Sequence, residues 1–292
     1  AELKKTDPDA VMLGEVWEDA SNKNAYGVQR EYLCGQETDS VMNYVFRQIV
    51  LDFLLGGADG KSAERRVRSM QENYPAQNLY AMMNLLGSHD RERILTILGQ
   101  APSCENVPAV HQAVYRLDRE RLARGIAREK LASLWQMTFP GVPSVYYGDE
   151  IAMEGYRDPY CRCPYDWDGG NADLREWYEK IIAIRNENVV LQTGRLEHVY
   201  GEGDVYGFAR VIDNGKDLFG AKAENGTFIV LLNRADHQRD VYVDVSKYKA
   251  DCLIDEFTGN KIPVVYGKIQ VSLPGFGYVL LRPASRPVNY PR

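Results

Sequence analysis

The chain has 292 residues, of which 45% are hydrophobic and 26% are charged, and its formal net charge is −6. This composition is typical of a globular protein with room for one large domain or two, and the mild acidity gives no reason to expect a nucleic-acid partner. No apolar run approaches the roughly 18–20 residues that a membrane span needs, so no membrane partner is expected.

The five cysteines are an odd number scattered along the chain, which does not indicate a disulfide framework. We therefore expect a reducing, cytoplasmic compartment. Cys161 and Cys163 form a C-x-C pair with the spacing of metal ligands. No second close pair of ligands accompanies them, so neither a metal nor another cofactor is predicted.

In chain order, the first predicted element is a strand at residues 10–17, "AVMLGEVW", which ends in Gly-Glu. A second, short strand at residues 40–44, "SVMNY", continues into a helix over residues 45–57. The double glycine at its end should terminate that helix. Both strands are continuous apolar runs, as expected of strands buried on both faces.

Two more strand-and-helix patterns follow. Residues 81–87, "AMMNLLG", predict a third strand, and residues 141–150, "GVPSVYYGDE", predict a fourth. Between them, residues 119–138 carry apolar side chains at spacings of three to five, which predicts an amphipathic helix with a core-facing stripe. Residues 100–117 are expected to form an irregular insertion.

After residue 190 the pattern changes to alternating, turn-rich runs such as "TFIVLLNR", "DVYVDV" and "IPVVYGKIQVSL". These runs predict an antiparallel β-sandwich at residues 191–292 with a hydrophobic core of its own. Strand-helix units in residues 1–190 predict a parallel sheet. Four such units are typical of the C-terminal half of a (β/α)8 barrel, and the chain begins as if within a helix. We therefore expect a fragment with open sheet edges that associates into a homo-oligomer.

Polar residues follow the predicted strands: Glu15 after the first, "GSHD" with His89 and Asp90 after the third, and Asp149-Glu150 after the fourth. The carboxyl ends of barrel strands meet on one face, and a pair of carboxylates is the minimum for glycoside hydrolysis. Each has a structural alternative. Asp90 could cap the helix "RERILTILG", Glu15 could be a satisfied strand-end carboxylate, and Asp149-Glu150 are better candidates for binding backbone amides than for chemistry.

Three motifs in order, "GEVW", "NLLGSHDRERIL" and "FPGVPSVYYGDEIAMEGYRDPYCRCPYDWD", resemble the α-amylase family of glycoside hydrolases, in particular its neopullulanase and cyclomaltodextrinase branch. The resemblance covers about residues 1–190, and the following sandwich suits the family's C-terminal domain. It implies a retaining hydrolase of α-1,4-glucans such as maltodextrin, cyclodextrin or pullulan, with an α-glucan oligosaccharide as the bound partner.

The resemblance also implies roles for individual residues. Glu15 stands at the position of the proton donor, and Asp90 at that of the carboxylate that stabilises the transition state. His89 matches a ligand of a sugar hydroxyl, and Asp158 with Arg162 matches a pair that binds the sugar on the non-reducing side. Trp17, beside Glu15, is expected to offer a flat face for a sugar ring, as are Tyr146 and Tyr147.

Two departures from the family pattern stand out. The family's nucleophile is an Asp in an Arg-x-Asp signature, and no such signature precedes Glu15. Arg91 occupies a position where the branch usually has Thr. Two alternatives stay open: a non-catalytic amylase-like protein of the kind that serves as a transporter's heavy subunit, and a transglycosylase or isomaltase-type relative.

Overall fold

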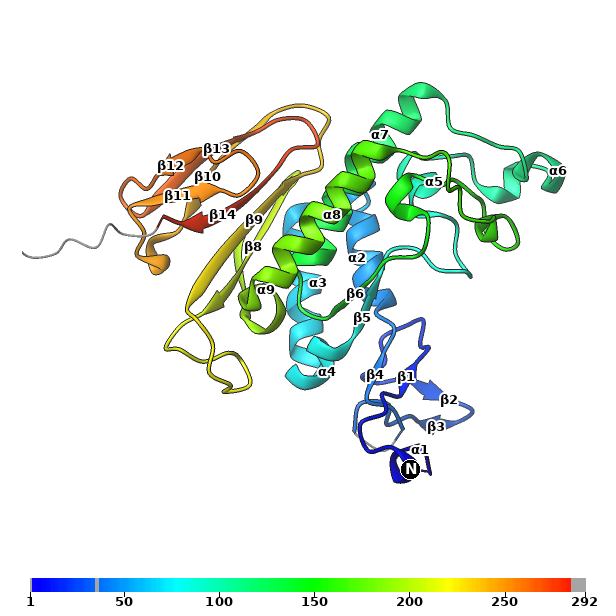
Figure 1. The fold of residues 1–292 in the computed structure, drawn as a ribbon, viewed down its shortest axis with the longest axis horizontal. Coiled ribbons are helices and arrows are strands. Elements are labelled where there is room, and N and C mark those ends of the chain that lie inside the picture. Colours follow the sequence, from blue (N-terminus) through cyan, green and yellow to red (C-terminus); the bar gives the residue numbers. More distant parts are fainter. Residues whose placement is uncertain (1, 35–36, 285–292) are drawn as a thin grey trace, which may run out of the picture.

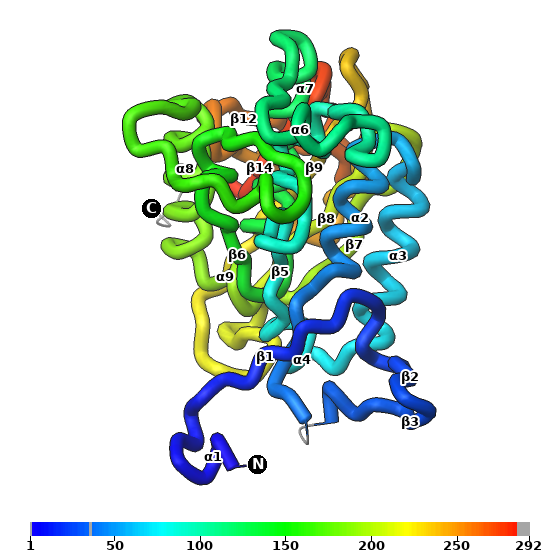
Figure 2. Tube along the Cα trace, turned by 90° about the vertical axis from the view of Figure 1, so that its right-hand side faces the viewer, coloured from blue at the N-terminus to red at the C-terminus, as the bar shows by residue number. Residues whose placement is uncertain are grey.

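The computed structural model of the chain describes residues 2–34 and 37–284. Its first part combines short parallel strands with helices, and its last part consists of antiparallel sheets (Figure 1). The N-terminal helix α1 (Glu2–Thr6) buries none of its residues and projects from the body of the molecule (Figure 2).

The strands predicted in the first part are all present, although each is shorter than the run that predicted it. They are β1 (Leu13–Gly14), β4 (Ser40–Val41), β5 (Met83–Leu85) and β6 (Val142–Ser144). β1 pairs in parallel with β4, and β5 pairs in parallel with β6. A bridge between Met42 and Met83 joins the two pairs, so the strand order is β1-β4-β5-β6. Their carboxyl ends therefore lie along one edge.

Helices follow and precede these strands. They are α2 (Tyr44–Leu54), α3 (Gly60–Asn73), α4 (Ala76–Ala81), α5 (Ile94–Leu98), α6 (Ala109–Gln112), α7 (Arg119–Thr138), α8 (Ala172–Glu187) and α9 (Val189–Thr193). Helix α7 has the predicted bounds, and α2 ends just before the double glycine, where Gly56 has a φ of 88°. Helices α3, α4, α8 and α9 and the small hairpin of β2 (Asn24–Ala25) and β3 (Val28–Gln29) were not predicted.

The insertion at residues 100–117 contains a single 3₁₀ turn, Cys104–Asn106, and the short helix α6. Beyond it, α7 supplies the centre of the core. Trp135 in α7 is completely buried and contacts the rings of Phe46 and Phe53 from α2 edge-on. The predicted apolar stripe of α7 is thus confirmed as core over its C-terminal half.

The C-terminal part has a six-stranded antiparallel sheet, ordered β12-β11-β14-β9-β8-β7, and a two-stranded sheet of β10 and β13. The strands are β7 (Arg195–Glu202), β8 (Val205–Ile212), β9 (Gly226–Asn233), β10 (Arg239–Asp244), β11 (Cys252–Asp255), β12 (Lys261–Pro263), β13 (Lys268–Leu273) and β14 (Tyr278–Pro283). Alternating residues of both sheets, among them Val243, Leu253, Ile269 and Leu281, form one buried cluster. The alternating runs therefore predicted these strands correctly, but the hairpin of β7 and β8 was missed.

This part has the expected core of its own, but it also contributes to a second core that it shares with the helices. The other face of the six-stranded sheet packs on the helices, and Tyr206, Phe208 and Val230 belong to the same buried cluster as Trp135 of α7. The rings of Trp135 and Tyr206 lie 4.7 Å apart. Figure 1 shows β8 and β9 running along the helical layer. The sheet is buried on both faces because helices cover one of them.

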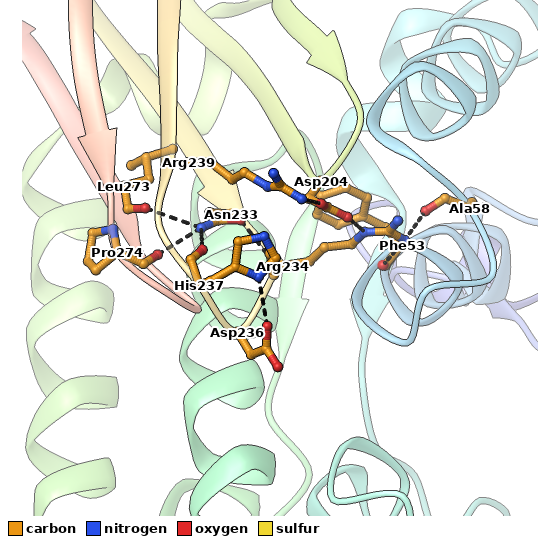
Figure 3. Close-up of polar contacts among 11 residues, drawn as sticks. Phe53, Ala58, Asp204, Asn233, Arg234, Asp236, His237, Arg239, Leu273 and Pro274 are labelled. Atoms are coloured by element: carbon orange, nitrogen blue, oxygen red, sulfur yellow. Dashed lines mark hydrogen bonds and ion pairs between the residues drawn. The ribbon is translucent and has the colours of Figure 1, made fainter.

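Arg234, just after β9, adds polar contacts at this junction. Figure 3 shows its side chain extending to the helical layer, where Nη1 donates to Phe53 O at 2.9 Å and also to Ala58 O. Its Nε donates to Asp204 at 2.9 Å, and Arg239 binds the same carboxylate. The sheet and the end of α2 are therefore joined by directional bonds as well as by apolar packing.

Candidate active site

The candidate site begins at the carboxyl ends of β1 and β5. Glu15 directly follows β1, and the residue is exposed. Its Oε1 accepts a hydrogen bond of 3.0 Å from Trp17 Nε1. This bond fixes the carboxylate relative to the indole ring, so the two predicted residues form one unit.

Trp17 packs between the elements that follow β4 and β5. Its ring stacks on Tyr44, the first residue of α2, with centroids 5.3 Å apart. The guanidinium of Arg91 lies 4.0 Å from the centroid of the Trp17 ring. Trp17 was predicted to present a face to a sugar, and 44% of the residue is exposed, but Arg91 occupies part of its surface. Sequence reasoning noted Arg91 as a departure and assigned it no role.

Asp90, His89, Asp158 and Arg162 form a connected polar cluster. Arg162 Nη2 lies 3.2 Å from Asp90 Oδ1, and Arg162 Nε lies 2.7 Å from Asp158 Oδ1 and donates to His89 O at 3.1 Å. His89 Nε2 lies 3.2 Å from Asp90 Oδ2. The loop after β6, which carries Asp158 and Arg162, therefore holds the "GSHD" segment at the end of β5.

The structure rejects the capping alternative for Asp90. Helix α5 begins at Ile94 with Arg93 at its N-cap, and no side chain caps it. The Asp90 carboxylate instead faces Arg162 and is about 30% exposed. It is partly accessible and held by a fixed cation, as a group that binds sugar hydroxyls would be.

Glu150 binds a backbone amide, as the structural alternative predicted, whereas Asp149 binds a guanidinium instead. Glu150 Oε2 accepts a hydrogen bond from the amide of Gly148 at 2.8 Å. Asp149 is buried and lies 3.2 Å from Arg93 Nη1. Burial raises the pKa of Asp149 to about 7, against the opposing effect of the Arg93 guanidinium. A Cβ on Gly87 would lie 2.2 Å from Asp149 Oδ2, so the glycine of "GSHD" lets the two loops meet.

Sequence reasoning missed Arg93 and the buried Glu129 of α7. The Arg93 guanidinium lies 4.3 Å and 4.6 Å from the ring centroids of Tyr146 and Tyr147, the two tyrosines expected to bind sugar. Tyr178 OH donates to Glu129 Oε1 at 3.2 Å, and burial raises the pKa of Glu129 well above its usual value. The only sequence signal for these two buried residues was a charged side chain within an otherwise apolar run. Such a signal does not predict which residue the charged group contacts.

Within residues 2–34 and 37–284, no group of three or more His, Cys, Asp and Glu side chains is arranged to hold a metal ion. All five cysteines, each of them among the described residues, are free. Cys161 is buried and its thiol donates to His89 O at 3.1 Å, whereas Cys163 is exposed. Cys161 therefore supports the "GSHD" loop. No described helix is long and apolar enough to cross a membrane.

Parallel strands alternating with helices, with carboxylates at the carboxyl ends of the strands, are typical of the catalytic domain of a β/α enzyme. The family described as "Alpha amylase, catalytic domain" matches residues 1–190. The chain belongs to the α-amylase family, and the resemblance drawn from the three motifs is confirmed.

Named relatives agree with this placement. The chain is 38% identical to an amylopullulanase of Thermoanaerobacter thermohydrosulfuricus over 299 residues, covering 98% of this chain and 19% of that protein. It is 32% identical to neopullulanase 2 of Thermoactinomyces vulgaris over 287 residues, covering 96% and 41%. A solved structure of a cyclomaltodextrinase matches with a TM-score of 0.74 and 25% identity, covering 97% of this chain and 42% of that one. The chain thus spans less than half the length of each.

Proposed function

We propose that the protein containing this chain is a retaining hydrolase of α-1,4-glucans, with maltodextrin, cyclodextrin or pullulan as substrate. One observation carries the proposal: Asp90 is held by Arg162 at the end of β5, and Arg162 is held in turn by Asp158. This cluster combines a partly exposed carboxylate with a fixed guanidinium, which suits a sugar with vicinal hydroxyls.

In the proposed reaction, Glu15 protonates the leaving glycosidic oxygen and then acts as base for the incoming water. Asp90 binds sugar hydroxyls more tightly as the ring flattens, so it contributes mainly in the transition state. His89 binds a hydroxyl of the same sugar, and Asp158 with Arg162 holds the sugar on the non-reducing side. The nucleophile is proposed to be an aspartate outside this chain, since no Arg-x-Asp signature precedes Glu15.

The proposal includes the organisation of the molecule. Residues 1–190 form the C-terminal half of a (β/α)8 barrel, and residues 191–292 form the β-sandwich domain. The outer edges of β1 and β6 have no strand partner among the described residues, which supports further pairing there, including pairing within a homo-oligomer. Light scattering tests the oligomer: a monodisperse monomer at micromolar concentration would exclude it. A cytoplasmic location stays a prediction from the cysteine pattern.

The test of the catalytic role is Glu15→Gln in the full-length protein. The variant keeps the shape of the side chain and its bond to Trp17, but it has no proton to transfer. We expect maltodextrin hydrolysis to fall by about 10²–10⁴-fold. Glycosyl fluorides need little acid assistance, so their cleavage should fall much less. Glu31→Gln, which makes the same change at another exposed glutamate before β4, is the matched control. Equal losses on both substrates would show that Glu15 is not the acid.

A further inference from the structure

A small cavity lies next to the candidate acid. It has a volume of about 230 Å³, and Trp17, which binds Glu15, forms one wall. Three arginines also line it: Arg47 from α2, Arg66 from α3 and Arg91 from the loop after β5. None of the roles assigned above uses this concentration of positive charge.

Two of these arginines have no counter-ion among the described residues. Arg66 forms an ion pair with Asp52 of α2. Neither Arg47 nor Arg91 forms an ion pair with any carboxylate of the described residues. Glu18, the acidic residue in the cavity lining, is bound instead to Lys23 at 2.6 Å. Two uncompensated guanidinium groups therefore share one cavity.

Arg47 carries the strongest sign of a missing ligand. The residue is only 5% exposed, and its Nε donates to Leu86 O at 2.6 Å, but its Nη2 is buried without any hydrogen-bond partner. Burial and the nearby charge of Arg91 lower the pKa of Arg47 to about 10, and the carboxylates of Glu92 and Asp149 act on it only from a distance. A buried N–H of a cation without an acceptor is costly, so an acceptor is expected there.

Arg91 is already in place to share that acceptor. Its guanidinium lies 4.0 Å from the centroid of the Trp17 ring and 5.4 Å from that of Tyr44. These rings hold the cation by cation–π attraction and provide no acceptor in the plane of its N–H groups. Its Nε is also buried without a partner. A neutral hydroxyl could accept one hydrogen bond, but only an anion also relieves the repulsion between Arg47 and Arg91.

We propose that this cavity binds a phosphoryl oxyanion, either as free phosphate or as the phosphate group of a phosphorylated sugar. Its oxygens accept charge-assisted hydrogen bonds from Arg47 and Arg91 together, and the aromatic rings of Trp17 and Tyr44 pack against a sugar that carries it. The sugar-borne form rests on the proposed hydrolase function, because it makes the cavity a subsite beside Glu15. The binding of free phosphate does not depend on that function.

The test is titration calorimetry on the full-length protein with inorganic phosphate, at constant ionic strength set with sodium chloride. The wild type should bind phosphate. Arg91→Met keeps the stem on Trp17 and removes the charge, so it should bind at least about tenfold more weakly, the effect of one charge-assisted bond. Arg65→Met, at an exposed arginine of α3, makes the same charge change outside the cavity and should bind as the wild type does.

Two further ligands distinguish the sources of the phosphoryl group. Glucose 6-phosphate binding more tightly than phosphate indicates a sugar-borne group, and equal or weaker binding indicates free phosphate. The inference is overturned if the wild type does not bind phosphate above the chloride background, if uncharged glucose binds as well as glucose 6-phosphate, or if Arg65→Met weakens binding as much as Arg91→Met. A protein that binds phosphate but cleaves no glucan refutes the proposed function alone. One that cleaves glucans but binds no phosphate refutes this inference alone.

Discussion

Replacing Arg234 by methionine tests how firmly the C-terminal sheets are attached to the helical layer. In the native chain, the guanidinium binds Asp204 at 2.9 Å and donates to the carbonyls of Phe53 and Ala58 (Figure 3). The Arg234 side chain is only 15% exposed, so water replaces these bonds poorly when the charge is removed. Methionine retains most of the aliphatic stem and therefore isolates the polar contribution.

The magnitude follows from the bonds that lose their donor. A hydrogen bond from a charged group contributes about 1.5–3 kcal/mol. In the variant, Phe53 O still accepts from the amide of Gly56, and Asp204 still binds Arg239. Most of the lost stabilisation therefore comes from the hydrogen bond to Ala58 O and from the partly buried ion pair between Arg234 and Asp204. We expect Arg234→Met to lower the free energy of unfolding by about 2–4 kcal/mol.

Urea unfolding of the full-length protein, followed by tryptophan fluorescence and far-UV circular dichroism, measures this loss. Arg239→Met is the matched control, because Arg239 binds the same Asp204 but is 42% exposed and has no bond to α2. That variant should lose only about 0–1 kcal/mol. Equal losses for the two variants would show that the bonds to the carbonyls of Phe53 and Ala58 do not hold the sheets to the helices.

Three other predictions concern single sites. Asp158→Ala or Arg162→Ala should weaken hydrolysis of maltotriose in the full-length protein. The melting temperature should change little, since both side chains are about half exposed. A large fall in melting temperature with unchanged kinetics would show that the pair is structural instead. Burial raises the pKa of Glu129 and so favours its neutral form. We therefore expect Glu129→Gln to change the free energy of unfolding by less than about 1 kcal/mol at pH 7, whereas Glu129→Ala should cost about 2–4 kcal/mol. A Gln variant as unstable as the Ala variant in urea would contradict a neutral carboxyl. Burial also lowers the pKa of His198 to about 4, below its unfolded value of about 6.5. The stability contributed by the neutral imidazole is therefore present above pH 6.5 and is lost as the pH falls towards 4. After allowance for partial exposure the loss is about 1–2 kcal/mol, and a pH–stability curve that His198→Gln leaves unchanged would contradict this prediction.

Strands β1, β4, β5 and β6 and helices α2 and α7 were predictable because their signals are local. A strand buried on both faces appears as a short apolar run wherever its partners lie, and α7 carries its own repeating stripe. Helix α3 was missed for the opposite reason. It buries only Gly60, Ala63, Val67 and Met70, and the remaining positions are mostly polar, so its stability depends on packing against α2 and β7. The contact with β7 joins residues that are far apart in the sequence.

In the candidate site, too, contacts between residues distant in sequence could not be predicted. The motifs around Glu15 and Asp90 could be found because their spacing along the chain is itself informative. The position of Arg91 over Trp17 could not be predicted, because the two residues are joined only when β1, β4 and β5 align. The pairing of Arg93 with Asp149 likewise depends on the loops after β5 and β6 lying together. Arg91 and Arg93 are both cations whose partners are distant in sequence.

One feature of the sequence that attaches the sheet to the helices can be interpreted only from the structure. Strand β8 reads "VYGFARVI" and is buried throughout, yet it contains Arg210, which is completely buried. The guanidinium donates to Thr138 O, the last residue of α7, at 2.8 Å and to Leu191 O at 2.7 Å. Arg185 of α8 similarly donates to Met137 O at 2.7 Å. The last carbonyls of a helix have no partner within it, and its C-terminus favours positive charge, so both arginines satisfy a buried helix end. An arginine within an apolar strand is thus explained by the end of a helix more than seventy positions away, and that helix end requires the sheet to be present.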